Sequence, residues 1–176
     1  MKPLKLLLTA CCLSFIVYSC KKDTGSAVIN PKTPGDTTST AATPADSSQA
    51  KMLQLVNAAR AKGCTCGTTA MPPVNPLVWN TILAQVALAH SKDMNDNNYF
   101  SHTGLDGSTP GDRLTAAGYI WTSYGENIAE GYSDVSSVMT GWLQSEGHCK
   151  NIMDAGFKEM GSGSDGAYWT QDFGSR

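Results

Sequence analysis

The main body of the chain opens with an apolar pattern of helical period. Four apolar residues between positions 50 and 62 recur three or four positions apart: Met52, Leu55, Val56 and Ala59. Spacing of this kind places side chains on one face of a helix, and Gly63 is typical of the position just past a helix end. The pattern predicts a helix over residues 50–62, followed by a long connecting loop through the cysteines and prolines of residues 64–76.

Three further helices are predicted downstream. The longest covers residues 79–95, where an apolar stripe of helical period ends in a polar run. The segment Ser108-Thr109-Pro110 supplies an N-cap and a first-turn proline for a short helix that closes at Gly118. The last covers residues 133–147 and places the segment SEGHCK at its C-terminal exit.

The end of the chain favours strands. Residues 158–163 and 167–173 read as two strands joined by a short Ser-Asp-Gly turn, and residues 125–130 form a shorter strand candidate. Helices come first and strands come late, with glycine-rich joints between them. This order predicts an α+β domain built in layers.

The first residues carry the pattern of an export signal. Lys2 and Lys5 precede an apolar run over residues 6–17, which is too short to cross a bilayer. A small serine before Cys20, with an aliphatic residue two positions further back, resembles a lipobox. We therefore expect residues 1–19 to be a lipoprotein signal peptide and Cys20 to carry lipid. The alternative is an ordinary signal peptide in which Cys20 has no special role.

The segment that follows lacks apolar periodicity. Residues 20–49, beginning at the lipidated cysteine, are rich in Thr, Ser, Pro, Gly, Asp and Ala and are predicted to form a disordered linker. Residues 50–176 then make one domain of ordinary size. Loss of the signal removes two of the 13 basic residues, so 11 face 15 acidic residues and the net charge becomes −4. A mildly acidic chain without a basic cluster argues against nucleic-acid partners.

The candidate chemistry begins with the three histidines of the chain. His90 falls on an apolar helical stripe, so a buried histidine with a local hydrogen bond is the simplest interpretation. His102 follows two aromatic residues in a loop, where side chains often serve binding. Glu126 lies in a strand candidate and needs a partner if it is buried. His148 and Glu146 lie at the expected helix exit, where the last carbonyls favour a protonated imidazole.

Four motifs in fixed order resemble those of one protein family. They are YFSHTGLDGSTPGDRLTAAGY, YGENIAEGYS, GWLQSEGHCKNIM and YWTQDFG. Their order and spacing are similar to the CAP superfamily (cysteine-rich secretory proteins, antigen 5 and pathogenesis-related 1), in its bacterial SCP-like extracellular branch. The resemblance covers about residues 51–174. It implies an α-β-α sandwich with a central antiparallel sheet.

The resemblance also implies a shared cleft with two histidines and acidic residues. By motif, its members here are His102, Glu126 and His148. The fourth family position, a glutamate three residues after the helix tryptophan, falls on Ser145, so Glu146 either substitutes for it or faces solvent. Some family members bind a divalent metal between the two histidines. His102 and His148 are thus the expected ligands of Zn2+ or another divalent cation, with water completing an open site.

The cysteines suggest a structural bridge. Signal removal and lipidation leave three of the six cysteines in the domain: Cys64, Cys66 and Cys149. In an oxidising compartment we expect Cys149 to pair with Cys64 or Cys66, because a direct Cys64–Cys66 bond would be strained. One thiol is then left free or able to exchange. A catalytic Cys149 beside His148 is the alternative.

The sequence is compatible with three functions. The leading hypothesis is a lipid-anchored, extracytoplasmic CAP-domain protein of a bacterial membrane, whose cleft binds a divalent metal or a small ligand such as a lipid, sterol or peptide. The second is a metal-assisted or acid–base hydrolase acting on peptides or cell wall, although the sequence holds no convincing nucleophile and no HExxH motif. The third treats the cleft residues as a structural or interaction module.

Overall fold

The computed structural model describes residues 42–176. The expected signal peptide, Cys20 and most of the expected linker lie outside the described residues, and so do the predictions made for them. The helices of the described part are α1 (Ser47–Lys62), α2 (Thr81–Asn97), α3 (Pro110–Ala116), α4 (Val135–Gln144) and α5 (Glu146–Met153). Within the same range, no helix is long and apolar enough to cross a membrane.

A four-stranded sheet forms the centre of this unit. It consists of β3 (Val78–Trp79), β5 (Glu159–Asp165), β6 (Tyr168–Ser175) and β4 (Ser123–Glu130), in that order. β4, β6 and β5 pair antiparallel, as expected, but β3 runs parallel to β5. The sheet is therefore mixed at one edge rather than wholly antiparallel, because the chain enters β3 from a long loop and pairs over only two residues before α2 begins.

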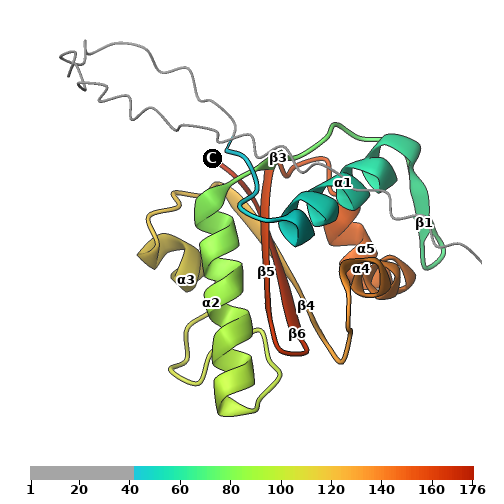
Figure 1. Ribbon diagram of the computed structural model, residues 1–176. Helices are drawn as coiled ribbons and strands as arrows, with labels where there is room; N and C mark the ends of the chain where they lie inside the picture. Colours follow the sequence, from blue (N-terminus) through green and yellow to red (C-terminus); the bar gives the residue numbers. More distant parts are fainter. Residues whose placement is uncertain (1–41) are drawn as a thin grey trace, which may run out of the picture. The chain divides into compact units, whose positions relative to one another are not determined.

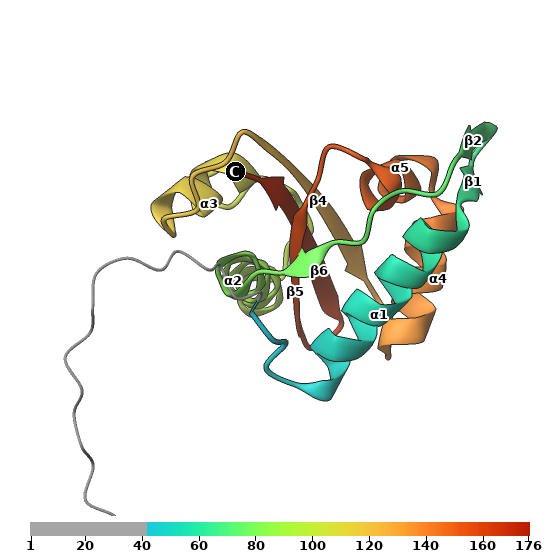
Figure 2. The ribbon, with the colours of Figure 1, turned by 90° about the horizontal axis from the view of Figure 1, so that it is seen from above.

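Helices cover both faces of the sheet. α2 packs on β5 and β6, with α3 beside it, while α1, α4 and α5 pack together on the opposite side (Figure 1). The view from above separates the three layers, with the sheet between the two groups of helices (Figure 2). This arrangement confirms the α+β class and the α-β-α sandwich.

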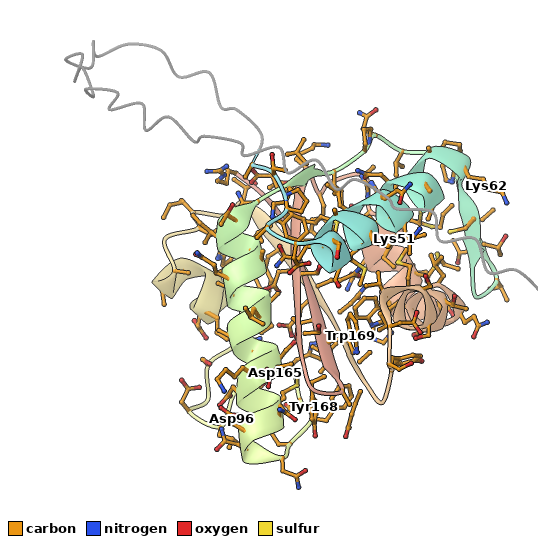
Figure 3. All side chains as sticks on the ribbon, in the orientation of Figure 1. Lys51, Lys62, Asp96, Asp165, Tyr168 and Trp169 are labelled. Atoms are coloured by element: carbon orange, nitrogen blue, oxygen red, sulfur yellow. A yellow bond between two sulfur atoms is a disulfide. The ribbon has the colours of Figure 1, made fainter. Side chains whose placement is uncertain are left out.

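Two glycines of β5 allow α2 to lie directly on the sheet. A Cβ built at Gly161 would lie 2.0 Å from the backbone nitrogen of Ala84, and one at Gly163 would lie 2.4 Å from the Cα of Leu88. At the far end of α2, Asn95 donates a hydrogen bond of 2.7 Å to the Asp165 carboxylate. Figure 3 labels Asp165 and Tyr168 at this end of the β5–β6 hairpin, beside Asp96 of α2.

The larger core lies on the other face of the sheet. It joins residues of α1, α4 and α5 with Trp79, Met160 and Phe173 of the strands. Trp142 is buried there and donates its indole N–H to the Ile128 carbonyl of β4 at 3.2 Å. This bond ties α4 to the edge strand that carries Glu126.

Several element boundaries differ from the sequence prediction. α1 begins at Ser47, because Asp46 accepts a hydrogen bond from the Gln49 amide and caps the helix. The expected loop over residues 64–76 contains a hairpin of β1 (Cys64–Cys66) and β2 (Thr69–Met71).

The predicted helix over residues 133–147 is in fact two helices. Ser145 has extended backbone angles and ends α4, and α5 starts at the next residue. The prediction that SEGHCK lies at a helix exit was therefore wrong. Glu146, His148 and Cys149 occupy the first turn of α5, because one extended residue between two helical segments leaves no trace in the apolar period.

Candidate functional site

Glu126 is the centre of a buried charged cluster. It lies on β4, and its side chain is only 2% exposed. One carboxylate oxygen accepts a hydrogen bond from His102 Nδ1 at 2.7 Å, and the other accepts one from Arg113 Nη2 at 2.6 Å. A carboxylate that is removed from water in this way requires such partners. The sequence analysis expected one partner for a buried Glu126, and the structure provides two, His102 and Arg113.

Arg113 is a member of the site that the sequence analysis missed. It lies on α3, which begins with a capping box between Thr109 and Asp112. Its second nitrogen, Nη1, donates to the backbone oxygens of His102 at 3.0 Å and Ser108 at 3.1 Å. One guanidinium therefore holds both the carboxylate and the histidine loop. The sequence places this arginine in the GDRL segment. A helix of seven residues is too short for its apolar pattern to show which side chains face the core.

His102 is held by its loop as well as by its ring. The loop follows α2, and the buried His90 in the middle of that helix donates from Nε2 to the Ser101 carbonyl of the loop at 2.9 Å. His90 is therefore the hydrogen-bonded core histidine that its position on the apolar stripe predicted, and it fixes the backbone next to His102. Because Nδ1 of His102 faces Glu126, its Nε2 remains for other contacts on a side chain that is 52% exposed.

His148 approaches the same strand from α5. Asn127 donates to the His148 carbonyl at 3.2 Å, and Asn151 donates to the Glu126 carbonyl at 3.1 Å. Burial lowers the pKa of His148, and the charge of His102 lowers it further. The expectation of a protonated imidazole at a helix C-terminus was wrong, because the first turn of a helix and a half-buried environment both disfavour the charge.

Glu146 does not join this cluster. Its carboxylate accepts from Lys150 Nζ at 2.6 Å along α5. It also lies over the turn of the β1–β2 hairpin, since a Cβ at Gly67 would come within 2.5 Å of Glu146 Oε2. As the first residue of α5, Glu146 points toward the hairpin, whereas His148 lies two positions further along the helix.

Asp172 is a second buried acid beside the cluster. It lies directly opposite Glu126 in the β4–β6 pairing, which places both side chains on one face of the sheet. It is fully buried, and neither carboxylate oxygen has a hydrogen-bond partner within residues 42–176. Burial, and then the negative charge of Glu126, raise the pKa of Asp172 well above its usual range. The sequence analysis did not single it out, since it lies in a run of strand residues.

The three cysteines of the domain come together at a separate place. Cys66 and Cys149 form a disulfide, and Cys64 is the free cysteine of the described chain. A bridge from Cys149 was expected, with its partner left open, and the structure selects Cys66. Because Cys149 is in a disulfide, it has no free thiol to act as a nucleophile. This argues against the alternative of a catalytic Cys149.

Within residues 42–176, one group of three His, Cys, Asp or Glu side chains has all its ligand atoms within 4.8 Å of one another, and it is Cys64, Cys66 and Cys149. His102, Glu126 and His148 do not form so tight a group. Two of the three sulfurs are already joined, so only the free Cys64 could offer a thiolate to a metal unless the disulfide is reduced.

Comparison with known proteins agrees with this architecture. The chain is 34% identical over 155 residues to the uncharacterized protein YkwD of Bacillus subtilis (strain 168), a match that covers 86% of this chain and 57% of YkwD. It spans between 28% and 57% of the length of the curated relatives that it matches.

Solved structures share the fold. An extracellular protein containing a SCP domain from Bacillus anthracis str. Ames has a TM-score of 0.66 and 36% identity, covering 73% of this chain and 40% of that one. The crystal structure of NaASP2 with Zn2+ has a TM-score of 0.51 and 14% identity, covering 73% of this chain and 82% of that one, and shows likeness of fold alone.

The family comparison covers most of the described chain. The model of the cysteine-rich secretory protein family, CAP, matches residues 53–173. This range includes the whole sheet apart from its last residues, the cluster around Glu126 and the disulfide. The chain therefore belongs to the cysteine-rich secretory protein (CAP) family.

Proposed function

We propose that this protein acts outside the cytoplasm, held to a bacterial membrane through a lipid on Cys20, and that its His102–Glu126–His148 site binds a divalent metal ion or a small ligand. The observation that carries the proposal is the hydrogen bond of 2.7 Å between His102 Nδ1 and Glu126. It leaves Nε2 of a half-exposed imidazole available to a ligand. An extracellular SCP-domain relative at 36% identity supports the location.

The His102–Glu126 pair has the form of a metal ligand with its supporting carboxylate. Histidines that bind metals almost always donate their other ring N–H to a carboxylate, a carbonyl or water. This contact fixes the tautomer and makes the ligating nitrogen more basic. Arg113 in turn holds Glu126 in place at 2.6 Å, so the imidazole is supported by a rigid network.

His148 supplies the second ligand in this proposal. Metal binding requires a neutral imidazole, and burial already lowers the pKa of His148. Two histidines leave further positions open to water. This donor set suits Zn2+, and the fold is shared with a protein crystallised with Zn2+. Bound there, the ion would supply Lewis acidity and lower the pKa of a water ligand.

The same residues also suit acid–base chemistry without a metal. In the tautomer that donates its Nδ1 proton to Glu126, Nε2 of His102 carries the free lone pair that a general base requires. A hydrolase acting on peptides or cell wall is therefore the second candidate for this site, and it requires turnover that falls when Glu126 is replaced by Gln.

An apolar ligand has a different place on the molecule. A groove between α1 and α4 is lined largely by apolar residues: Leu55, Ala58, Ala59, Lys62, Ser136, Met139, Thr140 and Leu143. Lys62 at the end of α1 is labelled in Figure 3. The groove lies on the α1–α4–α5 side of the sheet, so a lipid or sterol bound there would be independent of His102.

Calorimetric titration with Zn2+ tests the proposed metal site. We expect the intact protein to bind one ion per chain with micromolar or tighter affinity, and the double variant His102→Ala, His148→Ala to lose this binding. Glu126→Gln should weaken binding about 10- to 100-fold, the usual effect of losing a supporting carboxylate.

The cysteine cluster provides the matched control. Cys64→Ser removes the free thiol and should leave the zinc affinity unchanged. Loss of binding in Cys64→Ser, with retention in the double histidine variant, would move the metal to the sulfurs and overturn the proposal. Absence of binding in the intact protein would also contradict the metal site. A fluorescent fatty acid that binds equally to the double variant would indicate the separate groove.

A further inference from the structure

Three sulfur atoms meet where the β1–β2 hairpin touches α5. The free Sγ of Cys64 lies 3.5 Å from Sγ of Cys149 and 3.8 Å from Sγ of Cys66, the two atoms of the disulfide. Figures 1 and 2 show this hairpin at the end of α1, on the side of the sheet that carries α5. A thiol is therefore in contact with both sulfurs of a disulfide.

The strand geometry explains why two thiols compete for one partner. Side chains two positions apart in a strand point to the same side, so Cys64 and Cys66 of β1 both face α5. Cys149, in the first turn of α5, is fully buried between them and the rest of the core. The register of β1 with β2 keeps both cysteines in place.

We propose that these residues form a thiol–disulfide exchange site, in which the bond to Cys149 moves between Cys66 and Cys64. The thiolate of Cys64 attacks Sγ of Cys149, and the Cys64–Cys149 bond forms as the Cys66–Cys149 bond breaks. Cys66 leaves with the electron pair and takes up a proton, in place of the one that Cys64 released. The number of thiols and disulfides is unchanged, so no oxidant or reductant is needed.

The two bonded forms are similar in chain topology. The observed disulfide joins residues 83 positions apart, and the alternative would join residues 85 positions apart. Loop closure depends only weakly on such a difference, so the chain entropy does not favour either form. Burial raises the pKa of the Cys64 thiol. The attacking thiolate is therefore scarce near neutral pH, and exchange is a slow process that alkaline conditions make measurable.

Exchange at this place reaches the first turn of α5. Cys149 directly follows His148, whose carbonyl accepts from Asn127 of β4. The bond to Cys149 thus anchors the turn that carries one histidine of the candidate site. The exchange chemistry itself is independent of any ligand at that site.

Disulfide mapping by mass spectrometry tests the exchange. The full chain is prepared with Cys11, Cys12 and Cys20 replaced by Ser, so that only the three clustered sulfurs react. It is held at pH 8.5 without oxygen, quenched with acid at intervals, unfolded and alkylated with N-ethylmaleimide. We expect the label to lie first on Cys64 and then to spread, with at least a tenfold rise on Cys66.

Two variants in the same background make the result decisive. Cys66→Ser should form the Cys64–Cys149 disulfide, which shows that the alternative bond is reachable. The Cys149→Ser variant should carry label on both Cys64 and Cys66 after unfolding. It therefore calibrates how well each labelled cysteine is detected. Label confined to Cys64 at every time would overturn the proposal, and so would a Cys66→Ser protein in which Cys64 and Cys149 both remain free thiols.

Discussion

At the residue scale, the feature that most depends on its surroundings is Asp172. It is fully buried opposite Glu126, and neither oxygen has a hydrogen-bond partner among the described residues. Glu126 accepts hydrogen bonds from Arg113 and His102, so only this acid of the pair has partners that stabilise its negative charge. Burial, and then the negative charge of Glu126, raise the pKa of Asp172, so the second acid holds its proton.

Asp172→Asn should change how stability depends on pH. The folded protein holds the Asp172 proton to higher pH than the unfolded chain does, so this residue makes the free energy of unfolding fall as pH rises above about 4. The variant lacks this titration. We expect its stability relative to the wild type to increase between pH 4 and pH 7, by about 1 kcal/mol or more.

Urea unfolding at several pH values measures this difference. Asp96→Asn is the control, because Asp96 lies in an exposed ion pair with Lys92 and should change stability by less than about 0.5 kcal/mol at any pH. Parallel pH curves for the wild type and Asp172→Asn would contradict a raised pKa in the folded state.

At the element scale, the packing of α2 on β5 depends on the absence of side chains. Gly161 faces the helix so closely that any Cβ would meet the backbone of Ala84 rather than a flexible side chain. Backbone of this kind cannot yield without shifting the whole helix. The position of α2 in turn sets the loop that carries His102.

Gly161→Ala should therefore destabilise the protein strongly. The added methyl group would lie 2.0 Å from a backbone nitrogen, and we expect a loss of about 3 kcal/mol in the free energy of unfolding. Gly147→Ala is the matched control, since a Cβ there meets nothing within 4 Å on α5. That substitution should stabilise the helix by about 0.5 kcal/mol.

Thermal and urea unfolding of the two variants measure both effects: the loss of stability from the steric clash at Gly161 and the gain from higher helix propensity at Gly147. If Gly161→Ala were as stable as the wild type, α2 would have to sit further from the sheet than the structure shows. The zinc affinity of Gly161→Ala, where the protein remains folded, reports whether the His102 loop moves with the helix.

At the scale of the whole molecule, one disulfide and one arginine join distant segments. Arg60 of α1 is buried and donates to the carbonyls of Asn75 at 2.7 Å, Ile152 at 2.7 Å and Asp154 at 2.9 Å. The disulfide joins the hairpin after α1 to α5 across 83 residues. Together they connect α1, the loop that follows it and α5 on one side of the sheet.

Loss of the disulfide should lower stability by about 4 kcal/mol, since a cross-link over so long a loop restricts the unfolded chain. The comparison is between Cys64→Ser, which retains the bond and removes exchange, and the double variant Cys64→Ser, Cys149→Ser. Urea unfolding measures both, and Cys64→Ser alone should lie within about 0.5 kcal/mol of the wild type. A difference below about 1 kcal/mol would show that Arg60 and the apolar core are sufficient.

Much of the fold could be predicted from the sequence alone. The apolar stripes over residues 50–62 and 79–95 predicted α1 and α2, and the strand-like segments 158–163 and 167–173 with their Ser-Asp-Gly turn predicted the β5–β6 hairpin. These patterns are local, because the period of burial is written directly in the order of residues. The four motifs likewise indicate the CAP family and the α-β-α layers, and they include both His102 and Glu126, which share a hydrogen bond in the structure.

Only the tertiary structure decided which groups meet. Arg113 and Arg60 look like ordinary polar helix residues, and their burial depends on carbonyls and a carboxylate brought from other segments. The choice of Cys66 over Cys64 and the partnerless state of Asp172 depend equally on distant residues. Local periodicity determines which face an element buries, whereas charge pairing and disulfide choice require two segments in space, and that information is absent from any single stretch of sequence.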